Sequence, residues 1–292
     1  MKATPFEYVL ARSLTEATDA LGETEDAVVL AGGQSLVPLM NLRLAQPSVV
    51  VDINGISDLN KVERLNGTVR LGSMCRQRQL ETDPEITELA PLVSEAVVHV
   101  GHVQIRNRGT LGGSLSHADP LSELPAVLVA LEGEIETTST TGSRVIAARD
   151  FYVGTFTTTL EPGELLTSVS LPVPGRRDGF AWDEFSRRHG DFAVAGIAAV
   201  ISLDESGSCT HARLVGAGLG ATPVDLSGSA EPLIGLGELS DEVLLVVADG
   251  VAEGVDPTGD IHGSAEYRRE LAQLLTVKTL RTAWKRAEGV NR

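Results

Sequence analysis

Two glycine-containing segments are the parts of this sequence best suited to chemistry. Ala31-Gly32-Gly33-Gln34-Ser35 follows a short apolar run that starts at Asp26, and Thr110-Leu111-Gly112-Gly113-Ser114 has a similar order of small residue, glycine pair and serine. Glycine permits a positive φ and close approach of a ligand to the main chain, and successive N–H groups in such a turn form an anion-binding nest. The pair could hold one diphosphate from both sides. Either segment alone is equally compatible with an ordinary turn.

Composition excludes several other functions. The chain has 24 Lys and Arg against 40 Asp and Glu, a formal net charge of -16, which argues against nucleic-acid binding. Its two cysteines, Cys75 and Cys209, form no CxxC motif and are too few for an ordinary iron–sulfur cluster or an all-cysteine zinc site. No HxxxH or HExxH pair occurs among the 6 histidines. We therefore expect no metal site in this chain.

The sequence shows no targeting signal. Residues 1–11 lack a basic and apolar leader, and no apolar run reaches transmembrane length. With 42% hydrophobic residues, the chain has enough apolar material for a core. We expect a cytoplasmic protein without a transmembrane segment.

A third glycine cluster, residues 216–221, fits the dinucleotide fingerprint GxGxxA. That fingerprint requires a helix whose N-terminus meets the pyrophosphate. Pro223, Gly228 and Pro232 follow at once and prevent such a helix. We interpret this cluster as a glycine-rich strand end.

The elements that must position the two segments follow from apolar periodicity and turn residues. We predict a strand and then a helix within 6–22, capped by Ser13 and Glu16, and a short helix or irregular turn at 36–44. The remaining strands are predicted at 26–31, 48–53, 69–72, 134–138, 143–147, 164–171, 180–186, 194–203 and 209–216. The remaining helices are predicted at 77–82, 91–100, 125–131, 240–252 and 265–288, with a glycine-rich turn at 109–113.

These elements predict an α+β protein. A Pro- and Gly-rich stretch at 172–179 is the best candidate for a linker. We predict a first domain over 1–175, with lobes of about 1–55 and 56–175, and a smaller α+β domain over 176–292.

Four segments of the sequence resemble those of a known protein family. The runs AGGQSLVPLMNLRLAQPSVVVDI (31–53) and QIRNRGTLGGSLSHADPLSELPAVLVAL (104–131) are similar to the two flavin motifs of the FAD-binding medium subunit of molybdenum hydroxylases. That family includes aerobic carbon monoxide, nicotine and xanthine dehydrogenases. Residues 187–193 resemble its R-x-G-D-[aromatic]-A segment, and residues 264–268 its S-x-E-Y-R. The resemblance implies a two-lobed FAD-binding domain of the PCMH type, followed by a CO dehydrogenase flavoprotein-like C-terminal domain.

The resemblance also implies roles for individual residues. Ala31, Gly32, Gly33, Gln34 and Ser35 would wrap the FAD pyrophosphate, and Thr110, Leu111, Gly112, Gly113 and Ser114 would hold its other side and the ribityl chain. Ser114 replaces an Asn that is common in the family.

Three further residues are implied toward the two ends of FAD. Glu123 stands where the family often has an Asp that bonds the polar tail of the flavin, and Leu166 packs the adenine side. Phe192 falls where a Tyr or an apolar residue lies against the isoalloxazine ring. Plain core packing is the alternative for Phe192.

The function implied by the resemblance is that of an electron-transfer flavoprotein subunit with no catalytic residue of its own. Electrons would come from a small [2Fe–2S] subunit, fed by a large molybdopterin subunit, and would leave to an external acceptor. The family assembly is a dimer of heterotrimers. Two alternatives stay open: a stand-alone FAD oxidoreductase of the same flavin fold, and a flavin-free scaffold subunit. Carbon monoxide, nicotine-like heterocycles and purines all remain possible substrates of the complex.

Overall fold

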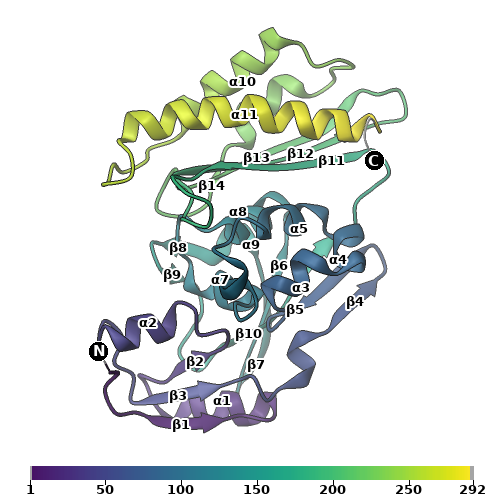
Figure 1. The fold of residues 1–292 in the computed structure, drawn as a ribbon. Coiled ribbons are helices and arrows are strands. Elements are labelled where there is room, and N and C mark those ends of the chain that lie inside the picture. Colours follow the sequence, from purple (N-terminus) through teal and green to yellow (C-terminus); the bar gives the residue numbers. More distant parts are fainter. Residues whose placement is uncertain (1, 290–292) are drawn as a thin grey trace.

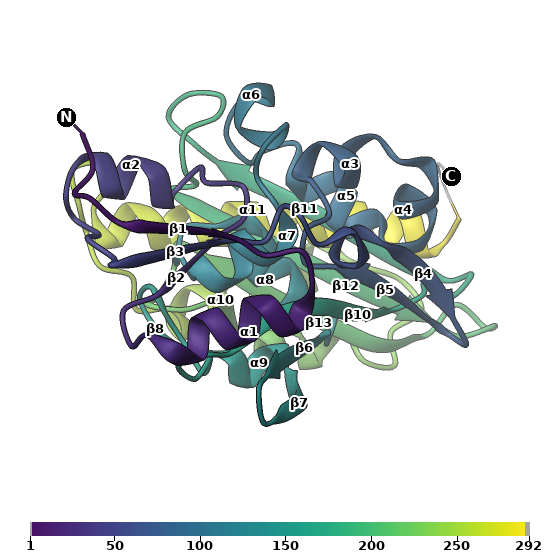
Figure 2. The same ribbon diagram turned by 90° about the horizontal axis from the view of Figure 1, so that it is seen from below.

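The computed structural model describes residues 2–289, arranged in three layers (Figure 1). The lowest layer in Figure 1 is a small lobe around a parallel sheet in the order β1-β3-β2. Its strands are β1 (Glu7–Leu10), β2 (Val28–Leu30) and β3 (Val49–Asp52), and its helices are α1 (Leu14–Glu23) and α2 (Leu36–Asn41). Figure 2 shows α1 and this sheet from below.

The start of α1 confirms the predicted cap. The hydroxyl of Ser13 accepts a hydrogen bond from the Glu16 amide at 3.1 Å. The Glu16 carboxylate reaches back to the amide of Arg12 at 2.7 Å, one residue before the expected Ser13 amide. Apolar residues of α1 and of the sheet then form a small separate core.

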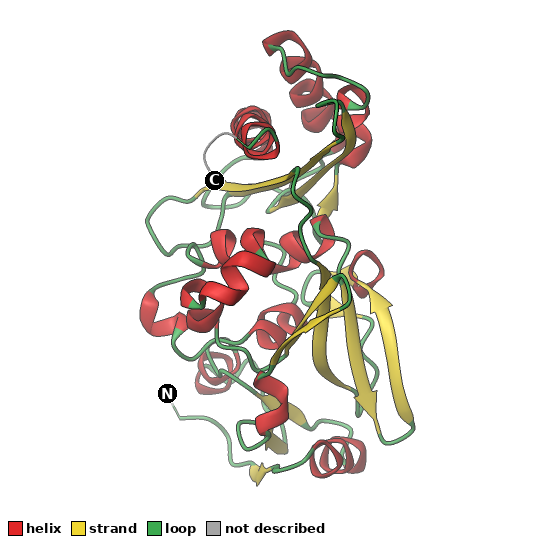
Figure 3. Cartoon of the chain, turned by 90° about the vertical axis from the view of Figure 1, so that its right-hand side faces the viewer, coloured by secondary structure: helices red, strands yellow, loops and turns green. Residues whose placement is uncertain are grey.

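The middle layer is a second lobe with an antiparallel sheet in the order β4-β5-β10-β6-β7. The strands are β4 (Val62–Leu65), β5 (Thr68–Gly72), β6 (Glu134–Ser139), β7 (Gly142–Ala147) and β10 (Leu165–Pro172). The helices of this lobe lie mainly on one side of the sheet (Figure 3). They are α3 (Gln77–Thr82), α4 (Pro84–Leu89), α5 (Pro91–Val97), α6 (Val103–Arg106), α7 (Leu111–His117), α8 (Glu123–Ala130) and α9 (Ala148–Phe151). Short elements complete the lobe: η1 (Ser57–Asn60), β8 (Tyr152–Gly154) and β9 (Thr157–Thr158).

The upper layer in Figure 1 is a third unit, an antiparallel sheet in the order β11-β12-β13-β14. It comprises β11 (Asp178–Phe185), β12 (Ala195–Leu203), β13 (Cys209–Ala217), β14 (Val224–Asp225), η2 (Ser227–Leu233), α10 (Asp241–Gly254) and α11 (Ala265–Ala287). Helix α11 covers one face of the sheet, and α5 and α8 of the second lobe cover the other. With both faces covered, almost every residue of β12 is buried. This packing ties the third unit to the second lobe.

Most predicted elements are present, and the α+β class is confirmed. Several short elements were not predicted, namely β4, β8, β9, β14, α4, α6, α9, η1 and η2. The expected glycine-rich turn at 109–113 was wrong, because it is largely the start of α7, with Thr110 as its N-cap. Within residues 2–289, no helix combines the length and apolar character that a membrane crossing requires.

Candidate functional site

The two glycine segments meet at the wall of a single cavity of about 540 Å³. A Cβ atom on Gly32 would collide with the carbonyl oxygen of Arg108 and lie 2.8 Å from the Cα of Gly109, so the two lobes touch backbone to backbone here. The third unit closes part of the cavity with residues 190–192. A cavity of this volume suits a ligand of cofactor size.

The first segment offers free backbone donors. It forms the loop between β2 and α2, and Gly33 has a positive φ of 72°. Among the described residues, none accepts a hydrogen bond from the amides of residues 32–35, although the carbonyls of Gly33 and Ser35 accept bonds from the first turn of α2. Unpaired amides that face a cavity are suited to bind an anion. The unpaired amides of residues 32–35 at the cavity wall are therefore compatible with the nest predicted from the sequence.

Two arginines add positive charge behind this loop. Arg76 donates to the carbonyl of Arg108 and, at 2.5 Å, to the Oδ1 atom of Asn54. Asn54 in turn donates to the carbonyl of Ala31 at 2.9 Å. Burial and the neighbouring charge of Arg108 lower the pKa of Arg76. Within the described part of the chain neither arginine has a carboxylate within salt-bridge distance, so their charge favours an anion nearby.

The second segment differs, because the amides of residues 111–114 are already paired. The amides of Leu111 and Gly112 donate to the carbonyls of Cys75 and Ser73 at 2.9 and 2.8 Å. The Gly113 amide donates to Oγ1 of Thr110 at 3.1 Å, and the Ser114 amide to the Thr110 carbonyl at 3.2 Å. The expectation of a second amide nest is therefore wrong. The groups left for a ligand are the hydroxyls of Thr110 and Ser114.

The predicted residues otherwise converge on the cavity. Its lining includes Ala31, Gly32, Gly33, Gln34, Ser35, Thr110, Gly112, Gly113, Ser114, Glu123, Leu166 and Phe192. Leu111 is the exception, since it is 2% exposed and belongs to the apolar core of the second lobe. Phe192 is 59% exposed, which is incompatible with the alternative of plain core packing.

Glu123 is an acid held in a neutral form. It is 3% exposed at the start of α8, and burial raises its pKa to about 8, with a further rise from the charge of Glu184. Burial also raises the pKa of Glu184, to about 7. Glu184 accepts from Nε1 of Trp182 at 3.1 Å and lies 3.6 Å from Nδ1 of His99. At neutral pH the cavity therefore presents the Glu123 carboxyl as a hydrogen-bond donor as well as an acceptor.

Comparison with known proteins decides the family. The FAD binding domain in molybdopterin dehydrogenase matches residues 4–174, and the CO dehydrogenase flavoprotein C-terminal domain matches residues 180–283. The chain belongs to the family of FAD-binding medium subunits of molybdenum hydroxylases. The family resemblance noted in the sequence is thereby confirmed.

Named relatives of this medium subunit span almost its full length. Subunit alpha of the 6-hydroxypseudooxynicotine dehydrogenase complex from Paenarthrobacter nicotinovorans is 40% identical over 98% of this chain and 97% of its own. The medium subunit of nicotine 6-hydroxylase from the same organism is 39% identical over 96% of this chain and 98% of its own. A chain of carbon monoxide dehydrogenase from Hydrogenophaga pseudoflava has the same fold, with a TM-score of 0.94, 33% identity and coverage of 98% of this chain and 99% of that one.

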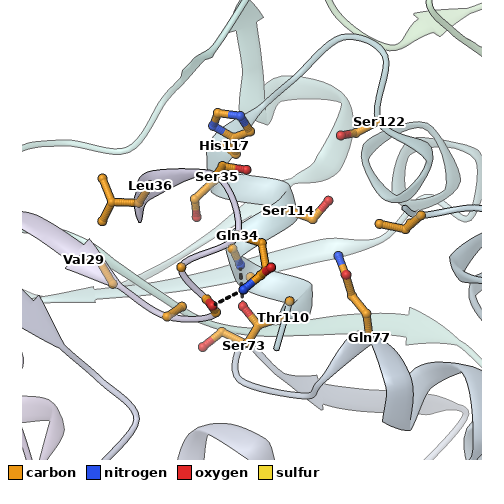
Figure 4. Close-up of a pocket in the computed structure, with 18 of the residues that line it drawn as sticks. Val29, Gln34, Ser35, Leu36, Ser73, Gln77, Thr110, Ser114, His117 and Ser122 are labelled. Carbon is orange, nitrogen blue, oxygen red and sulfur yellow. Dashed lines mark hydrogen bonds between the residues drawn. The ribbon is translucent and has the colours of Figure 1, made fainter. Parts of the chain in front are cut away.

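The cavity of this medium subunit fits FAD in several respects. The free amides at 32–35 suit its diphosphate, and apolar residues that flank this loop, such as Val29 and Leu36, also line the cavity (Figure 4). Two lining residues that the sequence did not reveal, Ser73 and Gln77, carry buried polar atoms without any partner among the described residues. No motif or periodicity distinguishes these two positions in the sequence.

Proposed function

We propose that this chain is the FAD-carrying electron-transfer subunit of a molybdenum hydroxylase. In this proposal, electrons from a small [2Fe–2S] subunit, which a large molybdopterin subunit supplies, would pass through this chain to an external acceptor. FAD would supply the redox chemistry when bound in the cavity. The chain itself binds the cofactor, orients it and shields it from water. Its two cysteines, Cys75 and Cys209, are both buried and too few to hold a cluster, which supports a separate iron–sulfur chain.

The observation that carries the proposal is the row of unpaired amides at 32–35 on the wall of a cofactor-sized cavity. We assign the diphosphate to this loop, with the hydroxyls of Ser35, Thr110 and Ser114 as further donors. Leu166 would pack the adenine side, and Phe192 the face of the isoalloxazine ring. Glu123 would hold its proton at the polar edge of the flavin. A flavin-free scaffold would have no use for such an arrangement.

The larger assembly follows from the same proposal. Relatives are named as medium chains or as subunits of complexes, so we propose small and large partner chains in a dimer of heterotrimers. We also propose a cytoplasmic location. The division into a FAD-binding domain over 1–175 and a C-terminal domain over 176–292 is part of the proposal.

The test adds one negative charge at the diphosphate loop. Ser35 is exposed on the cavity wall, so Ser35→Asp should fold normally but repel the diphosphate. A pair of unit charges about 4 Å apart near a protein surface interacts by ~1–4 kcal/mol, so FAD affinity should fall by roughly fivefold to several hundredfold. Ser13→Asp is the matched control, since it adds the same charge to the same lobe at an N-cap that Asp also satisfies.

The expected result is a flavin absorption spectrum in the purified wild-type chain and in Ser13→Asp, and its loss in Ser35→Asp. A wild-type chain that binds no flavin, or an equal affinity in all three proteins, contradicts the proposal. The assembly is tested separately, by purification of the tagged chain with its neighbours. Iron and molybdenum should then copurify with it.

A further inference from the structure

The segment from Ser73 to Gln77 lies alongside the second glycine segment. The amide of Gln77 donates to the carbonyl of Gly109 at 2.9 Å, and the Gly112 amide donates to the carbonyl of Ser73 at 2.8 Å. The Ser73 amide is held in turn by the carbonyl of Thr167 in β10, at 2.9 Å. Ser73 and Gln77 are four residues apart, and backbone hydrogen bonds hold the chain in place at both residues.

The side chains of these two residues are buried, polar and unpaired. Ser73 is 3% exposed and Gln77 is 4% exposed, and both line the cavity. Neither Oγ of Ser73 nor Oε1 of Gln77 has a hydrogen-bond partner among the described residues. A buried polar atom without a partner is costly and rare, and in a binding cavity it indicates an atom kept for a ligand. Figure 4 labels both residues beside Thr110 and Ser114.

Gly109, directly before the second segment, and Gly112 within it make room for these side chains. A Cβ atom on Gly109 would collide with Oε1 of Gln77 and lie 2.7 Å from its Cδ. A Cβ atom on Gly112 would lie 2.6 Å from the Cβ of Ser73. These two glycines thus admit Gln77 and Ser73 to the cavity wall.

The position of Gln77 indicates which part of the cofactor it meets. Gly109 lies between Gln77 and Gly32 of the diphosphate loop, in contact with both. In FAD the hydroxyl-bearing ribityl chain follows the diphosphate directly. We propose that Oγ of Ser73 and the carboxamide of Gln77 form a polar pair that hydrogen-bonds the ribityl hydroxyls of FAD. This inference rests on the proposed function, and it assigns flavin recognition to residues outside both glycine motifs.

The experiment replaces each polar atom by an apolar one of similar shape in the full chain. Gln77→Met and Ser73→Ala should each weaken FAD binding about tenfold, because each removes a hydrogen bond to the ligand. Neither should weaken the binding of ADP, which contains the diphosphate and adenosine but no ribityl chain. Without ligand, both variants should be at least as stable to heat as the wild type, because each loses an unpaired buried polar atom. Gln79→Met, on the same helix but away from the cavity, is the control and should bind FAD normally.

The outcomes separate this inference from the proposed function. Unchanged FAD affinity in both variants overturns it, as does an equal loss of ADP binding, which would indicate a distorted site. A lower melting temperature without ligand also overturns it, because that result identifies Ser73 and Gln77 as structural. A wild-type chain that binds ADP but no FAD contradicts the proposed function itself.

Discussion

Replacing Glu123 with glutamine removes an acid that the fold keeps protonated. The wild-type carboxyl has a pKa of about 8 in the folded chain, against 4.5 for an ordinary glutamate. Between these two pH values the folded state holds a proton that the unfolded state has released. The wild type must therefore lose stability as the pH rises through this window, and Glu123→Gln must not.

The size of the effect follows from proton linkage. One proton held by the folded state alone costs about 1.4 kcal/mol of unfolding free energy per pH unit. From about pH 5.5 to about pH 7.5, the variant should therefore gain about 3 kcal/mol over the wild type. The charges nearest this carboxyl are Glu184, Asp119 and Arg106, and all three stay in the variant. The difference between the two proteins thus isolates the Glu123 proton.

The assay is urea unfolding of the full chain without FAD, followed by circular dichroism at several pH values. Glu253→Gln, which changes an exposed residue at the end of α10, is the control and should show no pH-dependent difference from the wild type. If Glu123→Gln differs from the wild type by the same amount at every pH, the carboxyl is not held neutral and the reasoning is wrong.

Three further substitutions test the contacts that hold the elements around the site in place. Gly32→Ala should push the two lobes apart, because its Cβ would collide with the Arg108 carbonyl, and should lower both the melting temperature and FAD affinity. Arg106→Met should cost about 2 kcal/mol of unfolding free energy, measured in urea, since it removes two hydrogen bonds to the part-buried Glu81, which keeps only its ion pair with Arg78. Ser264→Ala removes the N-cap of α11 and should cost about 1 kcal/mol in the same assay, with FAD affinity unchanged.

Elements of the fold were predictable where apolar periodicity and turn residues within a short segment determine the structure. Helix α3 begins and ends at the predicted residues, and β6 and β7 lie close to the predicted strands 134–138 and 143–147, joined by a turn at Thr140-Thr141. Strand β4 was missed because Val62–Leu65 reads Val-Glu-Arg-Leu, with charged residues in its middle, and it lies at the edge of its sheet. Its position depends on pairing with β5, which the residues of β4 alone do not specify.

The burial of polar groups at the site could not be predicted from local sequence patterns. Gln77 is the first residue of a short helix, and it is buried with Gly109 packed against its side chain. The neutral form of Glu123 likewise depends on burial under the third unit and on Glu184, which is 61 positions later in the chain (184 − 123). Burial by distant segments sets both properties.

The two glycine segments look alike in sequence, but their glycines have different structural roles. At residues 32–35 the amides are free and Gly33 has a positive φ, so glycine serves backbone contact with a ligand. In the second segment the amides of residues 111–114 are bonded to the carbonyls of Ser73 and Cys75 and to the carbonyl and hydroxyl of Thr110, so glycine serves the packing of α7 against its neighbours. Only the first segment can act as an anion nest. Recognition beyond the diphosphate must then come from side chains, and Ser73 and Gln77 are the buried lining residues whose side-chain atoms are still unpaired.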